Sequence, residues 1–411
     1  MSKIAVLGFG VVGSGTVELF YKNKESICKK AGKELDVKYI LEIRDMTGME
    51  YAQKQVKDIS VILNDDEVTI VAEVMGGVNP AYDFVKSCLE KGKSVVTSNK
   101  ELVAAKGAEL LSIAKKNDCN FFFEASTGGA IPIIRPIHTC LAANEITGIA
   151  GILNGTTNFI LTKMINEGAN FDEVLKLAQE LGYAEANPAA DVEGHDACRK
   201  ICILSSLAFG KHVYPDNVYC EGITKITAED AAYATYWGGV IKLIGSVKKT
   251  KDGKILPMVR PAFVCNGNQL AHINDVFNGV VVYGDAIDEV MFYGRGAGKM
   301  PTASAIVADI IDAAKANGTC DSLTWEDTSD VSHIADYKDD ITSIYVRVSG
   351  GTKANAVEVF GDVQFLSREN RPSNEIAFIV SAMKEREFDE KLKLLKGNII
   401  GKIRVFEETE I

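Results

Sequence analysis

The predicted fold rests on one stretch of sequence, Lys3-Ile4-Ala5-Val6-Leu7-Gly8-Phe9-Gly10-Val11-Val12-Gly13. Its first five residues are mostly apolar and predict a buried strand. The glycines follow at once, and the amphipathic stretch Ser14–Lys30 after them predicts a helix. A glycine-rich turn between a strand and a helix presents backbone N–H groups to a phosphate. We therefore expect a dinucleotide-binding turn here.

The three glycines of this turn have separate physical roles. Gly8 permits the tight turn, Gly10 lets the backbone approach a pyrophosphate, and Gly13 lets the helix pack close to the strand. A purely structural glycine turn is the alternative, but its place between strand and helix favours a nicotinamide dinucleotide. The expected cofactor contacts of the turn are Gly8, Phe9, Gly10, Val11, Val12 and Gly13.

The residues at the end of the second predicted strand, Asp36–Ile43, bear on the choice between NAD and NADP. Arg44 would meet a 2′-phosphate, which favours NADP, whereas Glu42 or Asp45 would accept a hydrogen bond from a free ribose diol. A solvated charge at a strand end would explain each residue alone equally well. The sequence favours NADP and leaves NAD open.

Short apolar runs alternate with longer amphipathic stretches up to about residue 130. Further strands are expected at Val68–Val74, Ser94–Ser98 and Asn120–Glu124, and further helices at 80–89 and Lys100–Lys116. This alternation predicts an α/β fold with a Rossmann-type doubly wound parallel sheet, covered by helices on both faces. The dinucleotide-binding domain would comprise residues 1–132 and about 299–329, because the helix expected at Pro301–Ala316 would pack back onto it.

The remaining residues predict two more domains. Residues 133–298 mix helical and strand patterns, which indicates an α+β domain for substrate binding, catalysis and oligomerisation. Residues 340–411 form a smaller α+β domain, and Phe388–Leu395 is its clearest helix.

Composition and charge exclude several classes of protein. The chain has 411 residues, which predicts two or three domains. Its 45 Lys and Arg against 56 Asp and Glu give a net charge of −11, so we expect no nucleic-acid partner and no membrane partner. No run reaches the roughly eighteen apolar residues of a membrane span. The nine scattered cysteines predict buried thiols in a reducing cytoplasm rather than disulfides or a zinc site.

A candidate catalytic pair lies in the segment from Ala178 to Lys200. Asp196 and Lys200 are four residues apart and share one helix face, which continues into apolar residues. Burial would lower the pKa of the lysine and the aspartate would raise it, so the lysine could exchange a proton near neutral pH. A surface ion pair is the commoner meaning of this spacing. The spacing alone therefore leaves both interpretations open.

The same segment resembles the signature of the homoserine dehydrogenases. The signature runs alanine, three residues, glycine, an aromatic residue, a small residue, Asn-Pro, aspartate, Gly-x-Asp, three residues and lysine. Its fixed positions are matched by Ala178, Gly182, Tyr183, Ala184, Asn187, Pro188, Asp191, Gly194, Asp196 and Lys200. Further stretches resemble the family in the family's order, at residues 97–100, 124–126, 154–158, 294–298 and 301–304.

The resemblance implies interconversion of L-homoserine and L-aspartate 4-semialdehyde with NAD(P)(H). This reaction belongs to the aspartate-derived pathway to threonine, methionine and isoleucine. By analogy Lys200 would pass a proton to or from the substrate oxygen, and Asp196 would hold that lysine. Glu185 would meet the substrate ammonium, and Lys100 would reach both cofactor and substrate.

Several further contacts follow from the resemblance. Additional substrate contacts would be Tyr183, Thr156 and Asp191, and additional cofactor contacts would be Gly76, Ser98 and Gly298. The alternatives for the first three are core packing, helix capping and loop capping. Glu124 and the backbone carbonyls of Thr127, Gly129 and Ile131 resemble the family's monovalent-cation site. Because hard cations prefer oxygen ligands, we expect Na⁺ there.

Many members of this family end in an ACT regulatory domain of βαββαβ form. Residues 340–411 have a suitable length, but the segment 349–355 lacks the usual proline-glycine turn. We therefore expect the first helix of this divergent ACT-like domain to be missing and a strand to occupy Ala356–Phe360. Oligomerisation into a homodimer or homotetramer is the expected role, with ligand sensing as the alternative.

Two other functions remain open at this level. Fold alone does not fix the substrate, so another NAD(P)-dependent amino-acid dehydrogenase on the same scaffold is one alternative. A nucleotide-sensing regulatory protein without catalysis is the other. The pair Asp196 and Lys200 argues against a sensor, because a sensor has no use for a buried proton donor.

Overall fold

The structure is a computed structural model that describes residues 2–316, 318–320, 323–328 and 330–407. The chain divides into two compact units. Unit 1 comprises Met1–Asn144, Cys202–Pro215 and Gly294–Ser329, and unit 2 comprises Glu145–Ile201, Asp216–Tyr293 and Asp330–Ile411. None of the described helices is long and apolar enough to cross a membrane.

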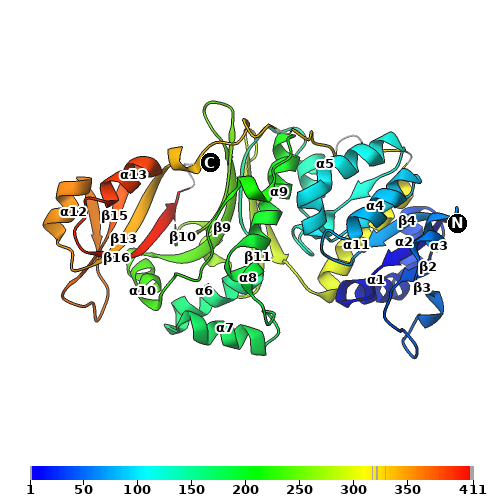
Figure 1. Cartoon of the computed structure of the whole chain (residues 1–411), viewed down its shortest axis with the longest axis horizontal. Helices are drawn as coiled ribbons and strands as arrows, with labels where there is room; N and C mark the ends of the chain where they lie inside the picture. The colour runs from blue at the N-terminus through cyan, green and yellow to red at the C-terminus, as the bar shows by residue number, and fades with distance from the viewer. Residues whose placement is uncertain (1, 317, 321–322, 329, 408–411) are drawn as a thin grey trace. The chain divides into compact units, whose positions relative to one another are not determined.

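Unit 1 is built on a parallel sheet of six strands among its described residues, in the order β3-β2-β1-β4-β5-β6 (Figure 1). This order is that of the doubly wound dinucleotide-binding fold, so the fold prediction is confirmed. The strands are β1 Ser2–Leu7, β2 Leu35–Leu41, β3 Gln55–Val56, β4 Val68–Glu73, β5 Ser94–Thr97 and β6 Phe121–Phe122.

Helices cover this sheet, and one expected helix is divided in two. The stretch predicted as one helix from Ser14 to Lys30 forms α1 and α2, which meet at Asn23. The helix predicted at residues 301–316 is α11, and it packs on α1 as expected: a methyl group on Gly15 would lie 2.7 Å from Cγ of Lys299. The helices are α1 Val11–Lys22, α2 Lys24–Ala31, α3 Ile59–Leu63, α4 Ala81–Glu90, α5 Lys100–Lys116 and α11 Lys299–Lys315.

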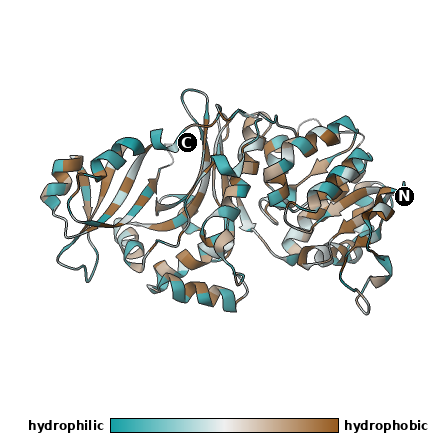
Figure 2. Ribbon diagram, viewed as in Figure 1, coloured by the Kyte–Doolittle hydropathy of each residue, from teal (hydrophilic) through white to brown (hydrophobic). Residues whose placement is uncertain are grey.

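The core of unit 1 lies between this sheet and its helices. Ile4, Ala5, Val6 and Leu7 of β1 are all fully buried, which explains why this central strand is apolar without alternation. Figure 2 shows the same pattern as brown strands with helices that have both brown and teal faces. Burying one such aliphatic side chain contributes about 1.5–3 kcal/mol, so the strand anchors the turn that follows it.

Unit 2 contains a second, mixed sheet in the order β12-β11-β7-β9-β10-β16-β13-β15-β14, with β8 paired to β10. Its strands are β7 Ile146–Ile152, β8 Tyr219–Cys220, β9 Gly239–Lys249, β10 Ile255–Cys265, β11 Phe277–Gly284, β12 Asp288–Arg295, β13 Ile341–Ser349, β14 Val363–Leu366, β15 Glu375–Lys384 and β16 Asn398–Phe406. Its helices are α6 Gly155–Glu167, α7 Phe171–Glu180, α8 Ala189–Val192, α10 Ala228–Trp237, α12 Lys353–Phe360 and α13 Glu385–Leu392, with the first part of α9 His195–Phe209, whose residues from Cys202 onward belong to unit 1. The short 3₁₀ or π turns of both units are η1 Ala52–Lys54, η2 Glu124–Ser126, η3 Pro136–Cys140, η4 Pro215–Asn217, η5 Gln269–His272 and η6 Tyr337–Asp339.

The C-terminal elements follow the order βαββαβ, and one prediction about them is wrong. The segment predicted to be a strand at Ala356–Phe360 belongs to the helix α12. Thr352 caps this helix by accepting a hydrogen bond from the backbone N–H of Asn355, and Gly361 ends it at a φ of +79°. A threonine cap and a glycine stop are strong helix boundaries, and they outweigh the β-branched residues between them.

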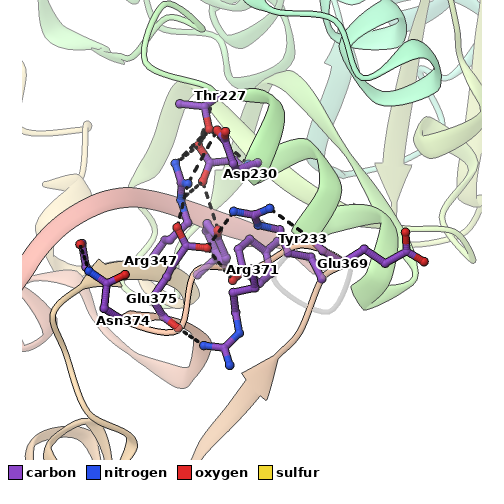
Figure 3. Close-up of polar contacts among 12 residues, drawn as sticks. Thr227, Asp230, Tyr233, Arg347, Glu369, Arg371, Asn374 and Glu375 are labelled. Atoms are coloured by element: carbon purple, nitrogen blue, oxygen red, sulfur yellow. Dashed lines mark hydrogen bonds and ion pairs between the residues drawn. The ribbon is translucent and has the colours of Figure 1, made fainter.

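A buried ion network joins these C-terminal elements to α10 within unit 2 (Figure 3). Arg347 of β13 forms ion pairs with Asp230 of α10, at 3.0 Å, and with Glu375 of β15, at 3.4 Å. Tyr233 donates a hydrogen bond to Glu375 at 2.9 Å. All four side chains are buried, and burial raises the pKa of Asp230.

Candidate active site

The glycine turn of unit 1 has the geometry expected of a phosphate cradle. Gly8 has a φ of +96°, a left-handed conformation that favours glycine. A methyl group on Gly13 would lie only 2.1 Å from the carbonyl oxygen of Gly8, so α1 can pack this close only with glycine there. A methyl group on Gly10 would meet no described atom within 4 Å, so its surface is open. These residues fit a bound pyrophosphate at the N-terminus of α1.

The end of β2 connects to this turn through Glu42. Its carboxylate accepts the backbone N–H of Phe9 at 3.0 Å and pairs with Arg44 through two hydrogen bonds, of 3.1 and 2.7 Å. The Arg44 guanidinium is the main cause that lowers the pKa of Glu42 to about 2. Asp45 instead accepts hydrogen bonds from Thr47 and caps its own loop. Glu42 and Arg44 therefore lie beside the turn, and Asp45 stabilises its own loop.

A buried carboxylate that no sequence pattern predicted holds the neighbouring loop. Glu73, at the end of β4, is fully buried and accepts hydrogen bonds from the backbone N–H of Met75 and the hydroxyl of Thr97. Asn99 donates to the carbonyl of Gly77 at 2.6 Å. Burial raises the pKa of Glu73. The ends of β4 and β5 are thus tied together at the edge where such sheets bind ligands.

The other predicted cofactor residues of unit 1 lie on this edge or on the helix that packs against α1. Ser98 directly follows β5, and Lys100 is the first residue of α5, whose N-cap is Asn99. Gly76 has a φ of +82° in the loop that Glu73 holds. Gly298 is the N-cap of α11 with a φ of +127°.

The predicted cation segment is organised around Glu124. This carboxylate is buried and accepts the backbone N–H groups of Ile133, Ile134 and Arg135, at 2.6, 2.9 and 2.8 Å. These three backbone donors hold the carboxylate in place. Carboxylate and carbonyl oxygens are the kind of donors that a monovalent cation takes.

The candidate catalytic pair is buried in unit 2, as the helix face predicted. The Lys200 ammonium donates to Asp196 at 2.8 Å and to the backbone carbonyl of Leu153 at 2.7 Å. Lys200 is 7% exposed and Asp196 is 4% exposed, so this is not the surface ion pair that the spacing alone also allowed. Two acceptors fix the direction of the amine, and an oriented buried amine can give or take a proton.

Asn154 completes this cluster, although the sequence assigned it no role. It is the N-cap of α6, and its amide donates to Asp191 at 2.7 Å and to Asp196 at 2.9 Å. An asparagine before Gly155-Thr156-Thr157 is a recognisable helix cap. The two aspartates that it contacts are 37 and 42 residues away, so only the fold reveals the bridge.

Tyr183 and Glu185 lie on an exposed loop after α7, and Thr156 lies in the first turn of α6. The Thr156 hydroxyl donates to the carbonyl of Tyr183 at 2.7 Å and so ties this loop to α6. The Tyr183 ring packs edge-on against Phe159 and remains 44% exposed. Glu185 is exposed, and Gln179 donates to its backbone carbonyl at 3.1 Å. Thr156 and Tyr183 therefore have structural contacts, and Glu185 has a carboxylate on the surface of unit 2.

Comparisons with known proteins identify the same family for both parts of the chain. The model for "Homoserine dehydrogenase, NAD binding domain" matches residues 8–124, and the model for "Homoserine dehydrogenase" matches residues 132–311. The first match contains the glycine turn, and the second contains Asn154, Asp196 and Lys200.

Individual relatives and solved structures that resemble this chain are also homoserine dehydrogenases. The homoserine dehydrogenase of Synechocystis sp. is 44% identical over 75% of this chain and 72% of its own length. That of Corynebacterium glutamicum is 36% identical over 97% of this chain and 93% of its own. The crystal structure of a homoserine dehydrogenase from Thiobacillus denitrificans superimposes with a TM-score of 0.89 at 32% identity, covering 99% of this chain and 98% of that one. The chain belongs to the homoserine dehydrogenase family, oxidoreductases that interconvert L-homoserine and L-aspartate 4-semialdehyde.

Proposed function

We propose that Lys200 is the group that passes the proton at the reacting oxygen of the substrate. A bound nicotinamide dinucleotide supplies the hydride transfer of this reaction. Lys200 gives its proton to the aldehyde oxygen in reduction and takes it from the hydroxyl in oxidation. The observation that carries this proposal is the buried amine, held at 2.7 and 2.8 Å by the Leu153 carbonyl and Asp196.

The proposed substrate contacts lie around this amine and on the loop after α7. Glu185 has the charge that a substrate ammonium requires, and its exposed carboxylate is accessible to a small molecule. Asp191 contacts Asn154 beside Asp196 and provides a second carboxylate for the polar end of the substrate. Tyr183 and Thr156, which hydrogen-bond to each other, and Lys100 at the start of α5 are further proposed substrate contacts.

The proposed cofactor is NADP, with NAD as the alternative. Gly8, Phe9, Gly10, Val11, Val12 and Gly13 would hold the pyrophosphate, with further contacts from Gly76, Ser98 and Gly298. The exposed guanidinium of Arg44 supports a 2′-phosphate contact. A similar solved structure is that of a hyperthermophilic archaeal homoserine dehydrogenase in complex with NADPH.

One assay tests these proposals together. Homoserine oxidation is followed at the reduced-nicotinamide absorbance band with NAD and NADP side by side, using the full chain. Homoserine-dependent reduction with a lower KM for NADP supports them. A lower KM for NAD would contradict the NADP proposal. Turnover of another amino acid in place of homoserine would contradict the substrate contacts.

Glu124 and the backbone carbonyls of Thr127, Gly129 and Ile131 are proposed to hold Na⁺ in a structural role. The Glu124 carboxylate also accepts the three N–H groups beyond it and so supports the segment. Thermal unfolding in NaCl compared with choline chloride tests this proposal. A melting temperature that is the same in both salts would contradict it.

The C-terminal elements are proposed to form an ACT-like domain, residues 340–411, that serves oligomerisation. Its βαββαβ order and its strand order β16-β13-β15-β14 support this proposal. The other proposed domains are residues 1–132 with about 299–329, and residues 133–298. We expect a homodimer or homotetramer by sedimentation, and a monomer would contradict the proposed role. A cytoplasmic location is proposed because all nine cysteines are free thiols.

A further inference from the structure

Asn154 lies between two carboxylates of the candidate active site. One hydrogen of its amide group goes to Oδ1 of Asp191, at 2.7 Å, and the other goes to Oδ2 of Asp196, at 2.9 Å. The same Oδ2 atom of Asp196 accepts the ammonium of Lys200 at 2.8 Å. Asn154 is 5% exposed, and its hydrogen bond to Asp196 is shielded from water.

The orientation of this amide is determined by its own contacts. Its oxygen accepts the backbone N–H of Thr157 at 2.9 Å, and a backbone N–H can only donate. Its nitrogen must therefore face the two carboxylates, which as ions can only accept. The two ends of one side chain thus have different tasks: the oxygen caps α6, and the nitrogen holds the aspartates.

We propose that Asn154 is a positioning residue that sets the proton affinity of Lys200 through Asp196. The amide donor disperses part of the negative charge on Asp196, because a hydrogen bond to a carboxylate stabilises its ionised form. Less of that charge is then available to retain the proton on Lys200. The amide also fixes which oxygen of Asp196 faces the amine.

The charged groups around Asn154 come from two elements. Asp191 is on α8, and Asp196 and Lys200 are on α9. An uncharged double donor can bridge both carboxylates, whereas a lysine would add a positive charge and an aspartate would add repulsion. This inference rests on the proposed role of Lys200. It adds Asn154 as the residue that adjusts the proton affinity of that lysine.

The test distinguishes the role of the Asn154 side-chain oxygen from the role of its nitrogen. Asn154→Ser keeps a side-chain oxygen that can cap α6 and removes the double donor, because serine is a good N-cap. Asn154→Ala removes both the capping oxygen and the double donor. The matched control is Asn170→Ser, which makes the same exchange at the exposed N-cap of α7 in the same unit. Each variant is assayed as the full chain for homoserine oxidation from pH 6 to pH 10.

In oxidation the amine of Lys200 must be neutral to accept the proton, so the rate rises with pH. We expect Asn154→Ser to lower kcat about tenfold, a fraction of what general acid–base catalysis contributes. We also expect the pH of half-maximal kcat to rise by about one unit, because Asp196 then retains the lysine proton more strongly. The KM for the cofactor and the melting temperature should stay close to those of the wild type.

Two results would overturn the proposal. A wild-type pH profile in Asn154→Ser, with the loss confined to Asn154→Ala, would mean that Asn154 only caps the helix. A decrease that is equal at every pH and accompanied by a lower melting temperature would mean a purely structural role. Lys200→Ala distinguishes this failure from failure of the proposed function: if that variant keeps its turnover, the role of Lys200 itself is wrong.

Discussion

Glu42 and Arg44 form a two-point ion pair beside the glycine turn, with Nε to Oε1 at 3.1 Å and a terminal nitrogen to Oε2 at 2.7 Å. The same Oε2 atom accepts the backbone N–H of Phe9 in the turn. The guanidinium is 67% exposed, and the carboxylate is buried. Glu42 thus stabilises the turn, while the Arg44 guanidinium faces the solvent, where a 2′-phosphate would bind.

Removing the exposed base should change the choice of cofactor. We expect Arg44→Ala to raise the KM for NADP by about 10- to 100-fold, the loss of a charged hydrogen bond, and to leave the KM for NAD within about twofold. Glu42 then remains free to accept from a ribose diol. Steady-state kinetics with both cofactors measure this, with Lys30→Ala as an exposed charge control in unit 1. An equal rise for both cofactors would show that Arg44 supports the turn rather than selecting the phosphate.

The ionised Glu42 should stabilise the folded state in a defined range of pH. Its pKa is lowered to about 2 from a usual value near 4.5, so its contribution is complete above about pH 4.5 and is lost as the pH falls towards 2. We expect Glu42→Gln to be less stable than the wild type at pH 6, and the difference to shrink between pH 4.5 and pH 2. Urea denaturation across this range measures it. A constant difference would assign the effect to packing rather than to charge.

Loss of the buried amine should affect chemistry more than binding. We expect Lys200→Ala to lower kcat by about two to four orders of magnitude, the usual contribution of a general acid, with little change in the KM for the cofactor. Lys163→Ala is a suitable control, because its ion pair with Glu167 is exposed. Pre-steady-state reduction of the nicotinamide measures the chemical step directly, and unchanged turnover would refute the proposed role.

The sequence was sufficient for the parts of the fold that depend on local pattern. The apolar run Ile4–Leu7, the glycines after it and the alternation up to residue 130 predicted the doubly wound sheet, because turn chemistry and burial are readable within a few residues. The helix α12 was missed, since its boundaries rest on the single residues Thr352 and Gly361 rather than on periodicity.

The site was predictable where a signature ran along one segment. Lys200 and Asp196 share one helix face, so their contact followed from spacing. The hydrogen bond of Thr97 to Glu73 and the bridge by Asn154 join residues 24 to 42 positions apart. Such pairs depend on how strands and helices come together, and no spacing rule within one element reveals them.

Arg347 offers a test of the C-terminal ion network in unit 2. Its guanidinium contacts the buried Asp230 and Glu375 and the part-buried Thr227 hydroxyl. Because Arg347→Met would leave the buried Asp230 without its cation and Glu375 paired only with Arg368, we expect a loss of about 3–5 kcal/mol in the free energy of unfolding. The exposed Arg386, paired with Asp336 and Asp339, is the matched control, and Arg386→Met should cost less than about 1 kcal/mol. Adding Asp230→Asn and Glu375→Gln to Arg347→Met should recover part of the loss, since the uncompensated charges are then removed. If the triple variant is less stable than Arg347→Met alone, the network stabilises unit 2 through its hydrogen bonds rather than through charge balance.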